Sequence, residues 1–213
     1  MVIDLDALVR RALARPGRRP LIGIAGPPGA GKSTLAERLV TAVGPAAAWV
    51  PMDGFHLADA ALDRLGLRDR KGAPETFDGW GYLALLRRLA VETDHPVWAP
   101  GFERTLEQPL AGSIPVHPEV RLVVTEGNYL LLDRPPWPQV RAALSEVWYV
   151  EADAGVRLER LLARHVEFGK SPAEARAWVA AVDEPNAGLV EATRHRADVI
   201  VPATVLESLP AVG

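Results

Sequence analysis

The stretch Gly26-Pro-Pro-Gly-Ala-Gly-Lys-Ser33 limits what this chain can fold into more than any other feature. It follows the apolar run 21–25 and precedes the helix-like segment 34–40, which is the strand, loop and helix order of the phosphate-binding P-loop motif. Glycines let the backbone turn so that successive N–H groups converge on phosphate oxygens at a helix N-terminus. The sequence therefore predicts a nucleotide site at this loop.

Within the loop, the residue types indicate separate roles. Lys32 is expected to reach the β- and γ-phosphates of ATP, and the Ser33 hydroxyl is expected to bind Mg²⁺. A glycine-rich turn with an accidental lysine is the alternative, and the flanking strand and helix patterns favour the motif. The residues expected to contact ATP here are Gly26, Pro27, Pro28, Gly29, Ala30, Gly31, Lys32, Ser33 and Thr34.

Composition excludes several other classes of protein. The 213 residues carry a net charge of −3, so bulk electrostatics gives no reason to expect nucleic acid or an anionic membrane as a partner. The absence of cysteine excludes disulfides, thiolate catalysis and cysteine-ligated metals. The chain shows no apolar signal core and no apolar run of membrane-spanning length. We expect a cytoplasmic protein with a single P-loop domain over 1–213.

The order of apolar runs and amphipathic segments predicts the fold. Strands and helices alternate, which indicates a three-layer α/β P-loop fold with a doubly wound, mainly parallel sheet. We expect strands at 21–25, 47–50, 96–99, 120–125, 146–150 and 198–201. We expect helices at 4–14, 34–40, 79–93, 137–144, 156–168 and 172–182, and irregular segments at 68–78 and 100–105.

Two acidic residues follow predicted strands. Asp53 comes after the strand at 47–50, and Glu126 follows the β-branched run 120–125. The carboxyl ends of parallel strands face the ligand crevice, so Asp53 is suited to accept a proton from a substrate hydroxyl. Glu126 is suited to act on Mg²⁺ directly or through water. The competing interpretations are a turn aspartate and an ordinary acid at the end of a strand.

A predicted pair of helices near 157–182 has the composition of a lid. Arg157, Arg160 and Arg164 share one helix face, and three like charges repel unless they are solvated or bound to an anion. A triphosphate would supply that anion, and both interpretations stay open. The Gly169 turn between the helices would give such a lid its mobility.

Five motifs, taken in order along the chain, resemble a known group of enzymes. They are the loop 26–33, Met52-Asp-Gly-Phe-His56, Arg70-Lys-Gly-Ala-Pro-Glu-Thr-Phe-Asp78, Thr125-Glu-Gly-Asn-Tyr-Leu-Leu-Leu-Asp133 and the run 157–170. Together they resemble the P-loop kinases that include phosphoribulokinase, uridine kinase and type I pantothenate kinase. The chain is most similar to their bacterial branch labelled nucleoside/nucleotide kinase family or fructose-transport-system kinase. The resemblance implies ATP-dependent phosphorylation of a small-molecule hydroxyl.

The resemblance also implies roles for individual residues. Asp53 matches the proposed base of the group, and Glu126 matches the acid of its Glu-Gly turn near the metal. The three arginines match the arginines of a lid helix that stabilise the transferring phosphate, with Arg160 and Arg164 acting in catalysis beside Lys32, and Arg157 contacting ATP. The residues expected to bind the acceptor are His56, Lys71, Phe77, Arg104 and Tyr129.

The sequence leaves the acceptor and the assembly open. Sugars, nucleosides and pantothenate-like alcohols are all candidates, and uridine is not carried over because Arg164-His165 departs from the Arg-Asp of many uridine kinases. One rival function is a nucleotide-hydrolysing switch without a small-molecule acceptor, and another is a binding protein that keeps only the fold. A homodimer is one candidate for the oligomeric state.

Overall fold

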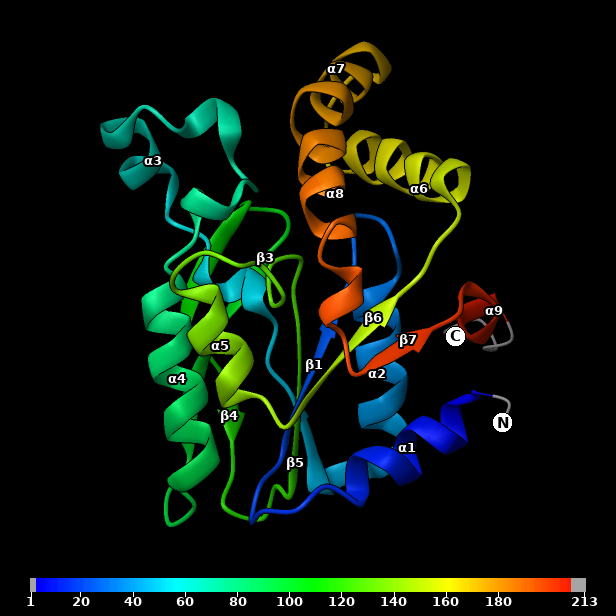
Figure 1. Ribbon diagram of the computed structural model, residues 1–213. Coiled ribbons are helices and arrows are strands. Elements are labelled where there is room, and N and C mark those ends of the chain that lie inside the picture. The colour runs from blue at the N-terminus through cyan, green and yellow to red at the C-terminus, as the bar shows by residue number, and fades with distance from the viewer. Residues whose placement is uncertain (1–2, 208–213) are drawn as a thin grey trace.

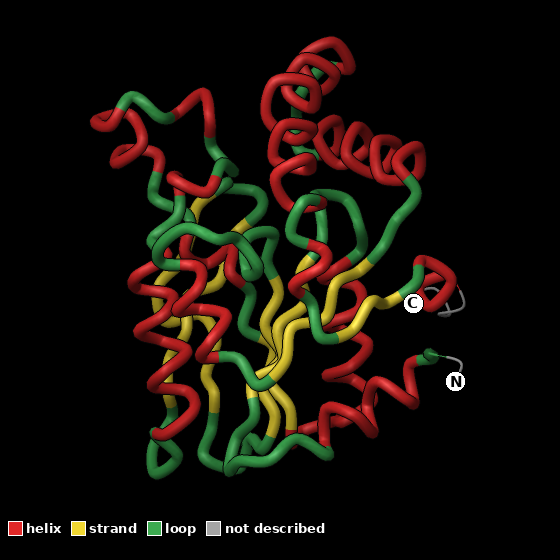
Figure 2. The backbone as a smooth tube through the Cα atoms, in the orientation of Figure 1, coloured by secondary structure: helices red, strands yellow, loops and turns green. Residues whose placement is uncertain are grey.

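A parallel β-sheet forms the middle of the molecule (Figures 1 and 2). The computed structural model describes residues 3–207, and in these residues the sheet has five strands. The three central strands are buried along their whole length, as expected of apolar runs that helices cover on both faces. The predicted mainly parallel α/β fold is confirmed. The order across the sheet is β2 (Ala47–Trp49), β5 (Leu122–Glu126), β1 (Leu21–Ala25), β6 (Glu146–Val150) and β7 (Val199–Val201).

Helices pack on both faces of this sheet (Figure 1). A hydrophobic core lies on each face of the sheet, and alternate residues of β1 belong to one core or the other, because successive side chains of a strand point to opposite faces. Ile22 and Ile24 belong to one core, whereas Leu21 and Ala25 belong to the other. The helices of the first core are α1 (Leu5–Leu13), α2 (Lys32–Val43) and α9 (Ala203–Glu207). Those of the second are α4 (Gly79–Val91) and α5 (Trp137–Ala143), with Val190 added from α8 (Glu184–Glu191).

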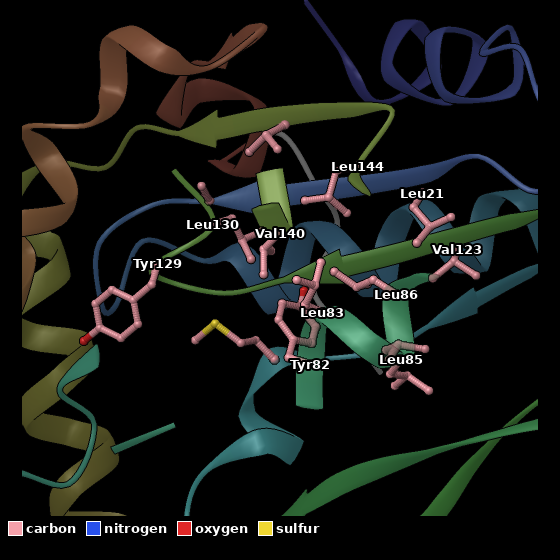
Figure 3. Packing of buried hydrophobic residues seen from close by; sticks show 14 of the residues in the cluster. Leu21, Tyr82, Leu83, Leu85, Leu86, Val123, Tyr129, Leu130, Val140 and Leu144 are labelled. Carbon is pink, nitrogen blue, oxygen red and sulfur yellow. The ribbon is translucent and has the colours of Figure 1, made fainter. Parts of the chain in front are cut away.

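The second core packs closely against a glycine in β1. A Cβ atom on Gly23 would lie 2.8 Å from Cδ1 of Leu144, since leucine side chains fill the space over the strand. Figure 3 shows Leu144 and Leu130 among the side chains that gather on this face. The leucine side chains therefore pack directly on the backbone of β1, and a larger residue at position 23 would require them to shift.

Three further helices stand beyond the carboxyl ends of the strands, at the top of Figure 1. α6 (Ala154–Glu167) is followed by α7 (Pro172–Trp178), which begins at the predicted Ser171 capping box. The prediction that this second helix ends near residue 182 was wrong, because it continues through a π-helical turn into α8 (Glu184–Glu191). Pro185 has no N–H to continue the α-helical ladder, and the helix widens ahead of it instead of ending.

An antiparallel hairpin beside α4 departs from the sequence prediction. It consists of β3 (Val97–Glu103) and β4 (Gln108–Val116), whereas only 96–99 was expected to be a strand and 100–105 was expected to be irregular. Prolines and glycines in both strands hide the alternation of apolar and polar residues that predicts a strand. Both strands are edge strands, which tolerate proline because one side of each strand makes no inter-strand hydrogen bonds. The register shifts between Ala99 and Gly101, where the hairpin bends.

The segment between β2 and α4 is largely irregular, as predicted for 68–78. It contains one short helix that the sequence prediction missed, α3 (Asp59–Leu65), and otherwise only short 3₁₀ turns at Met52–Phe55, Arg68–Arg70 and Pro74–Thr76. Further 3₁₀ turns lie at Gly44–Ala46 and Arg194–Arg196. Within residues 3–207, the structure contains no helix with the length and hydrophobicity needed to span a membrane.

Candidate active site

A cavity of about 560 Å³ lies at the carboxyl ends of the strands. The P-loop, the end of β5 and the turn after β2 form one part of its wall, and the β3–β4 hairpin and the α6–α8 helices contribute others. Lys32, Ser33, Asp53, Glu126 and Arg164 all line it, so the fold brings together residues from four separate motifs of the sequence. We call the part formed by His56, Lys71, Phe77, Phe102 and Arg104 the hairpin side.

The P-loop backbone has the conformation that its glycines permit. Gly29 and Gly31 have φ angles of 81° and 90°, in the left-handed region that other residues avoid. A Cβ atom on Gly29 would lie 2.7 Å from the main-chain oxygen of Arg157, and one on Gly31 would lie 2.6 Å from Cδ1 of Leu206. α2 begins directly after Gly31, so the free N–H groups of its first turn lie at the loop. This cradle fits the phosphates of a nucleotide.

Lys32 is buried against the loop that it follows. Its Nζ donates a hydrogen bond to the main-chain oxygen of Pro27 at 3.0 Å. Burial lowers the pKa of Lys32 to about 8, although the nearby Glu126 and Asp53 carboxylates oppose this shift. Near pH 7 most Lys32 side chains are therefore charged, which is the form that binds phosphate.

Glu126 and Ser33 place two oxygen ligands beside each other. The Ser33 hydroxyl donates to Oε1 of Glu126 at 3.3 Å, and the Glu126 side chain is buried. Burial, with a further contribution from the negative charge of Asp53, raises the pKa of Glu126 to about 7. Mg²⁺ in phosphate sites takes one or two protein oxygens together with phosphate oxygens and water. The hydroxyl and carboxylate present here fit that ion.

Asp53 lies on the 3₁₀ turn after β2 and forms an ion pair with the hairpin. Nη2 of Arg104 is 3.1 Å from Oδ2 of Asp53, whose side chain keeps 27% of its surface exposed. Burial alone would raise the pKa of Asp53, but the positive charges of His56 when protonated, Arg104, Arg164 and Lys32 outweigh it and hold the pKa below its ordinary value. Asp53 is thus an ionised carboxylate that can accept a proton.

The hairpin side of the cavity combines aromatic rings with paired charges. The ring centroid of His56 lies 4.0 Å from that of Phe77 and 4.8 Å from that of Phe102. Nζ of Lys71 is 2.7 Å from Oδ1 of Asp59 and also bonds to the main-chain oxygen of Glu107. Phe102 and Asp59 were not predicted as site residues, because Phe102 lies in the hairpin that the sequence pattern hid and Asp59 in the missed helix α3.

The three arginines of α6 do not share one environment. Arg157 is buried and donates to the main-chain oxygen of Pro28 at 3.2 Å and to Glu184 at 2.6 Å. Arg160 lies beside the P-loop, with Nη1 3.7 Å from the position of a Cβ atom on Gly31. Only Arg164 of the three lines the cavity among the residues that the structure describes. In this structure Arg157 ties α6 and α8 to the P-loop.

Tyr129 is buried in the core and does not line the cavity within residues 3–207. Its hydroxyl donates to the main-chain oxygen of Gly72, and its ring lies 5.6 Å from those of both Phe77 and Trp137. Figure 3 shows Tyr129 at the edge of the second core, with its hydroxyl directed away from the leucine side chains. In this structure Tyr129 supports the 68–78 loop from behind, and its expected contact with the acceptor stays a prediction.

Comparison with known proteins identifies the family. A family model described as methylmalonyl Co-A mutase-associated GTPase MeaB matches residues 4–51, the short segment that contains the P-loop. A Schizosaccharomyces pombe protein named as a putative uridine kinase is 33% identical over 225 residues, which cover 98% of this chain and 92% of the relative. The uncharacterized protein YggC of Escherichia coli is 36% identical over 205 residues, which cover 94% of this chain and 84% of YggC.

Solved structures agree with these relatives. The structure described as a putative fructose transport system kinase from Silicibacter sp. TM1040 is 38% identical, with a TM-score of 0.85 over 94% of this chain and 100% of that one. YFH7 from Saccharomyces cerevisiae, described as a putative P-loop containing kinase with a circular permutation, is 21% identical with a TM-score of 0.80, covering 94% and 98% of the two chains. This second likeness concerns the fold alone. The chain therefore belongs to the P-loop kinases of the phosphoribulokinase and uridine kinase group, and it is a phosphotransferase that uses ATP.

Proposed function

We propose that this kinase transfers the γ-phosphate of Mg-ATP to a hydroxyl group of a sugar, nucleoside or pantothenate-like alcohol. The observation that carries the proposal is the position of Asp53, an ionised carboxylate that lines one cavity with Lys32, Glu126 and Arg164. A kinase needs a group that orients the attacking hydroxyl next to the groups that hold the phosphate. The sequence prediction for Asp53 rested on the same logic.

Each residue has a defined task in the proposed transfer. The P-loop N–H groups and Lys32 would hold the β- and γ-phosphates. Ser33 and Glu126 would hold Mg²⁺, which would neutralise charge on the phosphate oxygens. The acceptor oxygen bonds to the γ-phosphorus while the bond to the oxygen of the leaving ADP breaks. Asp53 receives the proton of the acceptor hydroxyl, and Arg164 offsets the charge that develops on the transferred group.

The helices α6 and α7 are proposed to act as a lid near 157–182. Gly169 between them has a φ of 98°, and a Cβ atom there would meet no atom within 4 Å, so the turn is open to solvent. Closure over the phosphates would exclude water and limit wasteful hydrolysis of ATP. Arg164 and Lys170, which line the cavity from this part of the chain, would move with the lid.

The names of the relatives support two acceptor classes. A putative uridine kinase points to nucleosides, and a putative fructose transport system kinase points to sugars. Pantothenate-like alcohols stay in the proposal because the 71–78 loop resembles the corresponding loop of type I pantothenate kinases. A switch ATPase without an acceptor is the alternative, and the aromatic hairpin side of the cavity, which such a switch does not need, weighs against it.

The test is ADP production from Mg-ATP across a panel of sugars, nucleosides, pantothenate and related alcohols. We expect one class to stimulate ADP production and Asp53→Asn to lower turnover by about 10²- to 10⁴-fold, the usual effect of losing a general base, with ATP affinity nearly unchanged. Asp63→Asn, an exposed acid on α3, is the matched control and should keep full activity. Slow hydrolysis that no acceptor stimulates and that Asp53→Asn leaves unchanged would establish the switch ATPase instead.

A further inference from the structure

His56 is held rigidly on the hairpin side of the cavity. Its main chain pairs with that of Phe77 in an isolated antiparallel bridge, and its ring contacts the rings of both Phe77 and Phe102. The neighbouring residues Leu57 and Asp78 add main-chain hydrogen bonds of 2.8 Å on either side of this bridge. The position and the plane of the imidazole are therefore set by the fold before any ligand binds.

The hydrogen bond of the ring fixes which nitrogen carries the proton. Nδ1 of His56 lies 2.9 Å from the main-chain oxygen of Asp53. A carbonyl oxygen can only accept, so Nδ1 must donate. Burial, together with the charges of Lys71 and Arg104, lowers the pKa of His56 against the opposing influence of Asp53, and the ring is neutral near pH 7. In a neutral ring with a proton on Nδ1, Nε2 is a hydrogen-bond acceptor.

The cations around His56 are already occupied. Lys71 bonds to Asp59 at 2.7 Å, Arg68 lies 2.7 Å from the same carboxylate, and Arg104 pairs with Asp53 at 3.1 Å. A carboxylate or phosphate on the acceptor would have to share these cations with Asp59 or Asp53, whose negative charges would repel it. A neutral molecule with hydroxyl groups can instead donate hydrogen bonds to Nε2 of His56 and to Asp53, while its apolar face packs on the ring of Phe102 or Phe77.

We infer that Nε2 of His56 accepts a hydrogen bond from a second hydroxyl of the acceptor, and that the kinase therefore selects neutral polyhydroxy compounds of the sugar or polyol type over hydroxy acids and phosphorylated sugars. This assignment rests on the proposed function and makes His56 a specificity-determining residue of that site. Asp53 takes the proton of the hydroxyl that is phosphorylated, and His56 recognises a different hydroxyl of the same molecule. A monohydric alcohol can satisfy only one of the two groups.

The first arm of the test compares acceptor classes with wild-type protein. ADP production is measured with D-fructose, D-ribose, xylitol, D-glycerate, pantothenate and D-ribose 5-phosphate, and then with monodeoxy analogues of the best acceptor. We expect a neutral polyhydroxy compound to be preferred, and one monodeoxy analogue to lose roughly 10- to 100-fold in kcat/KM, the scale of one lost hydrogen bond in a desolvated site. Preference for glycerate, pantothenate or ribose 5-phosphate would overturn the inference and leave the kinase function standing.

The second arm uses two substitutions at position 56. His56→Asn keeps an amide nitrogen where Nδ1 bonds to the Asp53 carbonyl but has no counterpart of Nε2, and His56→Phe keeps a stacked ring without nitrogens. In either variant we expect the parent acceptor to fall to the level of the monodeoxy analogue, with the KM for ATP unchanged. If both variants still prefer the parent acceptor to its monodeoxy analogue, the role of His56 is overturned and the proposed kinase function is not. Absence of acceptor-stimulated turnover in the wild type would overturn the proposed function and this inference together.

Discussion

Arg104 and Asp53 are 51 positions apart in the sequence, yet Nη2 of Arg104 lies 3.1 Å from Oδ2 of Asp53. The contact joins the β3–β4 hairpin to the turn after β2. The two backbones also touch closely, because a Cβ atom on Gly54 would lie 2.3 Å from the main-chain oxygen of Pro100. The hairpin is therefore part of the proposed catalytic site, and its arginine helps to keep the Asp53 carboxylate ionised.

Removing the Arg104 charge should move the pH dependence of the reaction. Arg104→Gln takes away a cation that lowers the pKa of Asp53, so the pKa rises and the acid limb of the kcat/KM profile moves to higher pH. Activity at low pH falls more than activity at pH 8. Because the pKa of Asp53 lies below its ordinary value of 3.8, the profile is measured from pH 3 to pH 8, with Arg88→Gln, an exposed arginine of α4, as the control. An acid limb at the same pH in Arg104→Gln and in the wild type would show that Arg104 does not lower the pKa of Asp53.

Lys32→Met should abolish function without weakening the fold. We expect ATP affinity and turnover to fall together, because the lysine contacts the phosphates in both the ground state and the transition state. Burial lowers the pKa of Lys32 to about 8, so the charged side chain is not a source of stability in the ligand-free protein. The Tm of ligand-free Lys32→Met should thus equal or exceed that of the wild type. Normal ATP affinity in this variant would contradict the phosphate-binding role of the loop.

Gly29→Ala and Gly66→Ala form a matched pair. Both glycines have positive φ, 81° and 66°, but a Cβ atom on Gly29 would meet the Arg157 main chain at 2.7 Å, whereas one on Gly66 would meet no atom within 4 Å. We expect Gly66→Ala to cost about 1 kcal/mol of stability and to keep ATP binding. Gly29→Ala should lose ATP binding at least tenfold. Calorimetric titration with an ATP analogue measures ATP affinity, and thermal unfolding measures stability. Equal ATP affinities in the two variants would show that the P-loop backbone can shift without losing the nucleotide.

Arg157→Ala and Arg164→Ala should have different effects although both residues lie on α6. Arg157 donates to Pro28 and Glu184 from a buried position, so its removal should cost about 1–3 kcal/mol of stability and loosen α8. Arg164 lines the cavity, so its removal should lower kcat with little change in Tm. Urea unfolding and steady-state kinetics on both variants check this. A large loss of kcat with unchanged stability in Arg157→Ala would contradict this structural role and indicate that Arg157 binds the phosphates of ATP.

Glu126 should make the ligand-free protein less stable at alkaline pH. Its pKa is raised from 4.5 to about 7, so its protonated form favours the fold below pH 4.5, and this contribution is lost as the pH rises through 7. At 1.36 kcal/mol per pKa unit the loss is at most about 3 kcal/mol. Glu126→Gln, which cannot ionise, should lose less stability than the wild type between pH 5 and pH 8. Chemical denaturation at both pH values measures the difference, and parallel losses would contradict the raised pKa.

The sequence by itself determined the P-loop, the strands that lead into it and the position of two acids at one edge of the sheet. These features are local: glycine spacing sets the backbone of the loop, and buried apolar runs fix the parallel strands. The rule that parallel strands end at the same edge was enough to bring Asp53 and Glu126 to the cavity with Lys32. The family could also be recognised from the sequence, because its short motifs follow one another along this chain in the expected order.

Only the tertiary structure decided which side chains meet. No local pattern could show that Arg104 reaches Asp53, that the Phe102 ring contacts His56, or that Arg157 is buried while Arg164 lines the cavity. These contacts depend on a hairpin whose prolines and glycines hide its strands and on a helix face whose neighbours lie far away in the chain. Spacing along a sequence fixes the direction of a side chain from its own element, whereas its partner is set by how that element packs against the others.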